Sequence, residues 1–241
     1  MMKKLFEKDE VLFAILCIVI YVVGFSNADM ISENIGMPKV LTVCFGLVIS
    51  LILYHFIRKN KLSDYLGLTG FKGNVRDFIY FIPLILISSV NLWNGLTLNY
   101  SVLTSILSVI GMCFVGFLEE VIFRGFLFKG MCRSNVKSAI IVSSITFGMG
   151  HIVNVFMGAP LFETMLQLIY ASAVGFCFTA IFYVGGSILP CILSHAIVNA
   201  LSIFAVQPSD AMHIMIAVIQ TVISVSYGIW LLRVGVKSKQ Y

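Results

Sequence analysis

Two adjacent carboxylates and an arginine lie inside a long apolar stretch of the chain. Residues 101–118 carry no charge, Glu119 and Glu120 follow, and Arg124 is the next charged residue. Residues four apart share one face of a helix, so Glu120 and Arg124 are expected to pair. Glu119 is turned by about 100° from Glu120 and has no partner nearby in the sequence. An unpaired buried carboxylate is suited to take a proton from water, which is general-base chemistry.

Two histidines and an asparagine stand in other apolar stretches. His151 follows Gly148 and Gly150, small residues that would let a neighbouring helix approach closely. His195 and Asn199 are four residues apart and therefore share one helical face. Ionisable groups are costly inside a membrane, so these residues are expected to face the protein interior or water.

The composition requires a membrane around these residues. Of 241 residues, 59% are hydrophobic and only 11% are charged, whereas a soluble domain is about half apolar and about 25% charged. This excludes a soluble globular domain, a disordered chain and a basic nucleic-acid-binding protein, so the expected partner is the lipid bilayer and not nucleic acid. The six cysteines form no CxxC pair and are predicted to be apolar packing residues.

Eight apolar runs predict transmembrane helices, since a span needs about 20 residues and barrel strands would be about ten residues long. The first run is expected to be a retained span, because no A-x-A-like cleavage site follows it. We therefore predict an all-α polytopic membrane protein of about eight transmembrane helices, with residues 1–241 forming a single domain. The runs cover residues 11–27, 40–57, 78–94, 101–128, 138–157, 164–184, 187–206 and 211–232.

The basic residues lie in alternate connections between these runs. This bias predicts that both termini are cytoplasmic, in a cell membrane, and the short loops and lysine-rich start look prokaryotic. Lys39 falls outside the clusters, and Arg124 lies within a span. The clustered residues are Lys3, Lys4, Lys8, Arg58, Lys59, Lys61, Lys72, Arg76, Lys129, Arg133, Lys137, Arg233, Lys237 and Lys239.

The depth of the polar residues tests whether they can meet. At 1.5 Å per residue from the cytoplasmic ends, His195 lies about 10–12 Å deep, Glu119 about 14 Å and His151 about 20 Å. Contact between them is geometrically possible. His55 and His213 lie near the ends of their runs and are predicted to be interfacial residues.

Three motifs resemble one known family. Residues 119–124 read EEVIFR and resemble the EExxxR motif of the CPBP intramembrane proteases, which comprise the CAAX prenyl endopeptidases of the Rce type and the bacterial Abi proteins. Phe147-xxx-His151 resembles the family's FxxxH motif, and His195-xxx-Asn199 resembles its HxxxN/D motif. Order and spacing match over about residues 100–205, the expected motif-bearing catalytic core. The first hundred residues carry no motif.

The resemblance implies an eight-helix membrane fold with a catalytic cavity open toward the cytosolic side. It implies that Glu119 activates a water molecule, which His151 helps to hold and polarise. His195 and Asn199 would donate hydrogen bonds to the oxyanion of a tetrahedral intermediate, and the Glu–Arg pair would give structural support. The expected activity is hydrolysis of a membrane-associated peptide or protein without a cofactor.

Zinc is the alternative to this metal-free mechanism. Glu119, His151 and His195 form a carboxylate and two imidazoles, a common catalytic zinc set with water in the fourth position. That set would leave Asn199 without an evident role, and no HExxH motif is present. The resemblance favours the metal-free mechanism.

Two other functions compete with an endopeptidase. One is a catalytically silent membrane scaffold, or a bacteriocin-immunity or regulatory protein of the same fold. The other is a proton-coupled transporter in which buried glutamate and histidine form a relay. The intact motifs argue against the scaffold, and the adjacency of the two carboxylates argues against a relay.

Overall fold

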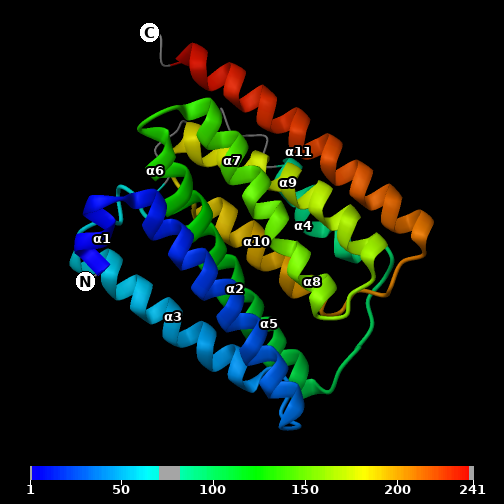
Figure 1. Cartoon of the computed structure of the whole chain (residues 1–241). Coiled ribbons are helices and arrows are strands. Elements are labelled where there is room, and N and C mark those ends of the chain that lie inside the picture. Colours follow the sequence, from blue (N-terminus) through cyan, green and yellow to red (C-terminus); the bar gives the residue numbers. More distant parts are fainter. Residues whose placement is uncertain (1, 71–81, 239–241) are drawn as a thin grey trace.

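The chain forms a bundle of helices (Figure 1). The computed structural model describes residues 2–70 and 82–238, with side chains to residue 234. Within these ranges the β-type pairing is limited to an isolated antiparallel bridge between Leu96 and Ala205, so the all-α prediction is confirmed. The elements are α1 (Met2–Lys8), α2 (Glu10–Asn34), α3 (Val40–Lys59), α4 (Ile82–Ser89), η2 (Val90–Leu92), α5 (Val102–Glu119), η3 (Glu120–Phe128), α6 (Lys129–Cys132), α7 (Val136–Met149), η4 (Gly150–Ile152), α8 (Val153–Phe156), α9 (Leu161–Gly185), α10 (Leu189–Ser202) and α11 (Asp210–Ser238).

The described chain contains six helices that are long and apolar enough to cross a membrane. Two shorter apolar helices, Ile82–Leu92 and Leu189–Ser202, coincide with the third and seventh predicted runs. Residues 78–81 of the third run lie outside the described residues. The chain is thus a multi-pass membrane protein, but the predicted count of eight spans is not confirmed. The six long helices are Glu10–Asn34, Val40–Lys59, Val102–Cys132, Val136–Phe156, Leu161–Gly185 and Asp210–Val234.

The outer surface of the bundle is apolar. Val19 and Val23 on α2 and Leu51 on α3 are each exposed over more than half of their surface. An apolar surface of this extent would cause a soluble protein to aggregate, whereas acyl chains solvate it in a bilayer. The interior holds the charged exceptions, because Glu120 and Arg124 are fully buried.

Small residues set the closest helix contacts. A Cβ atom on Gly148 would lie 1.9 Å from Ser172 Oγ and 2.8 Å from the carbonyl oxygen of Leu168, so α7 and α9 touch through this glycine. The close approach predicted at Gly148 is therefore confirmed. The same prediction for Gly150 is wrong, because a Cβ atom there would meet nothing within 4 Å.

The helix carrying the two glutamates changes its winding between them. The α-helical turns of α5 end at Glu119, and η3 is a π-helix from Glu120 to Phe128 in which every residue is buried. The sequence predicted regular α-helical geometry through this stretch. π-Helical turns are rare and are frequently found at functional sites.

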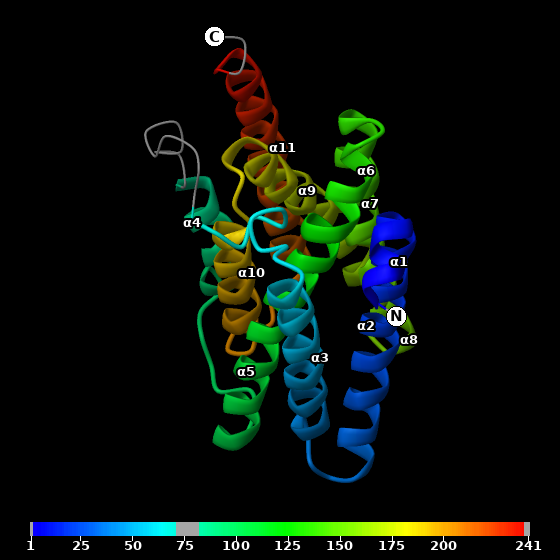
Figure 2. The same ribbon diagram turned by 90° about the vertical axis from the view of Figure 1, so that its left-hand side faces the viewer.

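The bundle in Figure 2 has two ends, and they differ in the number of basic residues that they carry. We call one the basic end: it comprises α1, residues 58–70, residues 129–137 and the end of α11. The far end comprises residues 35–39, 93–101, 157–160 and 203–209. Apart from Lys39 at the far end and Arg124 in the interior, the described basic side chains lie at the basic end. Lys72, Arg76 and Lys239 lie outside the described residues, as does the side chain of Lys237.

Candidate active site

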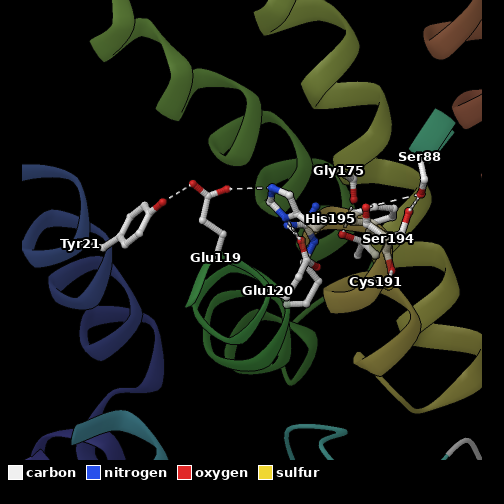
Figure 3. Close-up of polar contacts among 11 residues, drawn as sticks. Tyr21, Ser88, Glu119, Glu120, Gly175, Cys191, Ser194 and His195 are labelled. Carbon is white, nitrogen blue, oxygen red and sulfur yellow. Dashed lines mark hydrogen bonds and ion pairs between the residues drawn. The ribbon is translucent and has the colours of Figure 1, made fainter. Parts of the chain in front are cut away.

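Glu119 and Glu120 lie at the junction of α5 and η3, deep in the bundle. Glu120 is 0% exposed and Glu119 is 9% exposed. The two carboxylates diverge, as the helical rotation predicts, and they contact different partners (Figure 3). One glutamate is therefore part of the packed interior, and the other reaches the edge of a cavity.

Glu120 pairs with Arg124, as the sequence predicts. Arg124 Nη1 donates to Glu120 Oε1 at 3.1 Å, and both side chains are fully buried. The guanidinium lies 4.1 Å from the centroid of the Phe147 ring and 5.6 Å from that of Phe178. These aromatic faces stabilise the cation in a site that water does not reach. Gly175 provides the space for the guanidinium, because a Cβ atom at this position would lie 3.2 Å from Arg124 Nη2.

His195 lies between the two glutamates. Its Nδ1 is 2.9 Å from Glu120 Oε1, and its Nε2 is 3.6 Å from Glu119 Oε2. Because a carboxylate accepts hydrogen bonds, we infer that Nδ1 carries a proton and donates a hydrogen bond to Glu120. Glu120 therefore fixes the tautomer and the orientation of the ring, and Nε2 points toward Glu119.

Tyr21 of α2 is the partner of Glu119 that sequence reasoning missed. Its hydroxyl donates to Glu119 Oε1 at 2.5 Å, and Figure 3 shows it opposite His195 across the carboxylate. A tyrosine in an apolar run carries no signal of its own. Its depth could have identified it, since Tyr21 lies about 16 Å along α2 from Glu10 at 1.5 Å per residue, close to the depth of about 14 Å expected for Glu119.

His151 stands between two cavities. One, which we call the α2–α5 cavity, has a volume of about 250 Å³, and Glu119, Tyr21 and His151 contribute to its walls. It extends past Ser108 to Asp29 and includes Tyr21, Val22, Phe25, Ser26, Asp29, Lys39, Thr42, Val43, Leu107, Ser108, Gly111, Met112, Val115, Glu119, Phe123, Phe147, Gly150, His151, Val153, Asn154 and Met157.

The second cavity, which we call the α9–α10 cavity, has a volume of about 430 Å³. His151, His195 and Asn199 all line it, so these three predicted residues are brought together on one surface. His213, predicted to be an interfacial residue, lies in its wall. Asn91, Gln167 and Gln220 add amide groups that sequence reasoning did not single out, because isolated amides in apolar helices usually connect helices.

The described residues do not fit the zinc alternative. Within residues 2–70 and 82–234, no three His, Cys, Asp or Glu side chains are arranged to hold one metal ion. His195 directs Nδ1 to Glu120 and Nε2 toward Glu119, and His151 lines the cavity that Glu119 borders.

Taken together, the long apolar helices and the buried Glu–Arg–His cluster define a multi-pass membrane protein with a candidate acid–base site inside the bundle. The profile of the Rce1-like family, described as type II CAAX prenyl endopeptidase Rce1-like, matches residues 101–201. Residues 101–201 are thus an Rce1-like type II CAAX prenyl endopeptidase (CPBP) family domain, as the three motifs predict. No curated protein and no solved structure matches the chain significantly.

Proposed function

We propose that the protein is an intramembrane endopeptidase that hydrolyses a membrane-associated peptide or protein. The observation that carries the proposal is the position of Glu119. Its carboxylate is fixed by Tyr21 on one oxygen, faces His195 on the other, and borders a cavity that His151 also lines. The family domain supports the same reaction class.

In this mechanism Glu119 is the general base. It takes a proton from a water molecule that His151 helps to hold, and the water oxygen attacks the carbonyl carbon of the peptide bond. The proton then passes to the leaving amine as the carbon–nitrogen bond breaks. A base held in position by hydrogen bonds typically contributes about 10²–10⁴-fold to the rate.

His195 and Asn199 stabilise the oxyanion that forms during the attack. With Nδ1 donating to Glu120, His195 can donate to the oxyanion from Nε2 only when that nitrogen also carries a proton. Glu120 and Arg124 therefore act through His195 as positioning residues. No cofactor is needed for these steps.

The proposed setting is a single membrane domain over residues 1–241, with the catalytic core at about 100–205. Eight helices cross or enter the membrane, the two short ones included, and both termini are cytoplasmic. The charge bias of the connections supports this orientation.

Membrane peptidomics tests the proposal even though the substrate is not yet identified. Membranes from cells expressing the unchanged chain, Glu119→Gln or the matched control Glu33→Gln are compared by mass spectrometry. Glu33 is an exposed carboxylate near the end of α2, so its variant controls for charge loss. Fragments made by the unchanged chain and by Glu33→Gln, but absent with Glu119→Gln, are the expected result. The same fragments from all three would refute the proposal.

A further inference from the structure

We infer that the peptide reaches the proposed site from the extracytoplasmic face, because the cavities around Glu119 and His195 extend to the far end, whereas the described residues between the site and the basic end are tightly packed. This inference rests on the proposed function for the identity of the ligand. It differs from the cytosolic opening that the family resemblance implies.

The basic end is closed by an aromatic layer. Phe6 of α1 contacts Phe13, Phe56 and Phe126 with ring centroids 5.4, 5.9 and 5.8 Å apart. Phe126 is fully buried, and this layer lies between the glutamates and the basic end of the bundle. Among the described residues, packed side chains therefore separate the site from that end.

A covering loop reinforces the closure. Leu66 is fully buried against Gly125, and the carbonyl oxygen of Gly67 accepts a hydrogen bond from the backbone of Ile188. Tyr65 donates to Glu10 at 2.6 Å, and burial, reinforced by this carboxylate, raises the pKa of Tyr65. The hydroxyl therefore stays protonated and keeps its bond over the physiological range.

Both cavities extend in the opposite direction. The α2–α5 cavity runs from Glu119 to Asp29 and Lys39, and the α9–α10 cavity runs from His195 to Gln207 and Pro208. These outer residues all belong to the far end or lie beside it. The residues lining either cavity include none from the aromatic layer or from residues 60–70.

Charge assigns the far end to the outside. Short connections rich in lysine and arginine remain in the cytoplasm, and the basic end carries these connections. A cytoplasmic basic end places the mouths of both cavities on the extracytoplasmic face. The cytosolic opening and the cytoplasmic termini therefore cannot both hold for this chain.

The walls indicate the chemistry of the peptide. Most of the residues that line the α2–α5 cavity between Asp29 and Glu119 are apolar. The α9–α10 cavity offers amides and Glu163, and no lysine or arginine lines it. A peptide that crosses the site would place apolar residues in the first cavity and a polar, neutral or basic flank in the second. The substrate class is thus an extracytoplasmic juxtamembrane segment.

Labelling with a membrane-impermeant sulfonated maleimide in intact cells tests the access route. The background replaces Cys17, Cys44, Cys113 and Cys132 by alanine and keeps Cys177 and Cys191, which are fully buried, so the core is undisturbed. Gly150→Cys and Gln207→Cys report on the two cavities. Glu33→Cys reports on the far end outside the cavities, and Ser134→Cys on the basic end.

The expected result is reaction of Gly150→Cys, Gln207→Cys and Glu33→Cys in intact cells, with Ser134→Cys reacting only after permeabilisation. Reaction of Gly150→Cys and Gln207→Cys only after permeabilisation would overturn the inference, whether or not Glu33→Cys reacts from outside. Labelling requires no turnover. If the cavity cysteines react from outside but the peptidomic comparison shows no Glu119-dependent fragments, only the peptidase proposal is refuted. If such fragments appear but the cavity cysteines react only after permeabilisation, only the access route is refuted.

Discussion

At the scale of single residues, the site depends on how the oxygens of two neighbouring carboxylates are occupied. Glu120 Oε1 accepts hydrogen bonds from both Arg124 and His195, so this carboxylate positions these two side chains. Glu119 receives a hydrogen bond on Oε1 from Tyr21 alone, and Oε2 lies 3.6 Å from His195, beyond hydrogen-bond distance. The structure thus supports a division of roles between an accessible carboxylate and a structural one.

Tyr21→Phe removes only the hydroxyl that orients Glu119. A hydrogen bond to a charged group contributes about 1.5–3 kcal/mol, and a loss of about 1.4 kcal/mol is tenfold in rate. We expect kcat to fall about tenfold or more with KM almost unchanged. Steady-state kinetics on a fragment-derived peptide measures this, with the exposed Tyr54→Phe as control. An unchanged kcat, or an effect on KM alone, would contradict the positioning role.

Arg124→Met leaves the Glu120 carboxylate buried without its cation. Breaking a buried pair on one side costs about 3–5 kcal/mol, so the melting temperature in detergent should fall sharply. The double variant Glu120→Gln/Arg124→Met removes both charges and should recover much of the stability but not the cleavage. Equal melting of the single and double variants would show that the pair is not coupled.

The sequence predicted the charged part of the site but not its aromatic and hydroxyl partners. Charge is so scarce in apolar runs that Glu119, Glu120 and Arg124 are conspicuous, and four-residue spacing predicts the Glu120–Arg124 contact. The bond from Tyr21 depends on how α2 packs against α5, which no local pattern encodes. The placement of His195 between the carboxylates depends in the same way on α10.

At the scale of elements, α7 and α9 make close contact through Gly148, and Gly150 nearby provides a control position without such a contact. Gly148→Ala would drive a methyl group into Ser172 and the backbone of Leu168, and overpacking typically costs about 1–3 kcal/mol. Gly150→Ala enters open space. We expect thermal unfolding in detergent to show a lowered melting temperature for Gly148→Ala only. Similar melting of both variants would contradict the close α7–α9 contact.

The apolar runs predicted where helices occur but not how they are wound. Each run coincides with helix in the described residues, because continuous apolar segments in a membrane must satisfy their own backbone hydrogen bonds. The π-helix at Glu120–Phe128 was not predictable. All of its residues are buried, so the sequence has no alternation of polar and apolar faces from which the number of residues per helical turn could be predicted. The two short helices likewise match their runs in position but not in full length.

At the scale of the whole molecule, the bundle arranges a base and an imidazole without a three-ligand metal set in the described residues. We therefore expect cleavage by the purified protein to be unchanged by EDTA or 1,10-phenanthroline. Rate measurements before and after chelation, with zinc added back, test this. Loss of hydrolysis on chelation and its recovery with zinc would contradict the metal-free mechanism.

The proposed function depends above all on the Glu119 carboxylate, which activates water for peptide hydrolysis. The most direct measurement is the single-turnover cleavage rate of a fragment-derived membrane peptide by purified protein in liposomes, compared between the unchanged chain and Glu119→Gln. Both proteins must first show the same thermal unfolding. We expect a loss of about 10²–10⁴-fold in the variant. Cleavage by Glu119→Gln at the rate of the unchanged chain would contradict it.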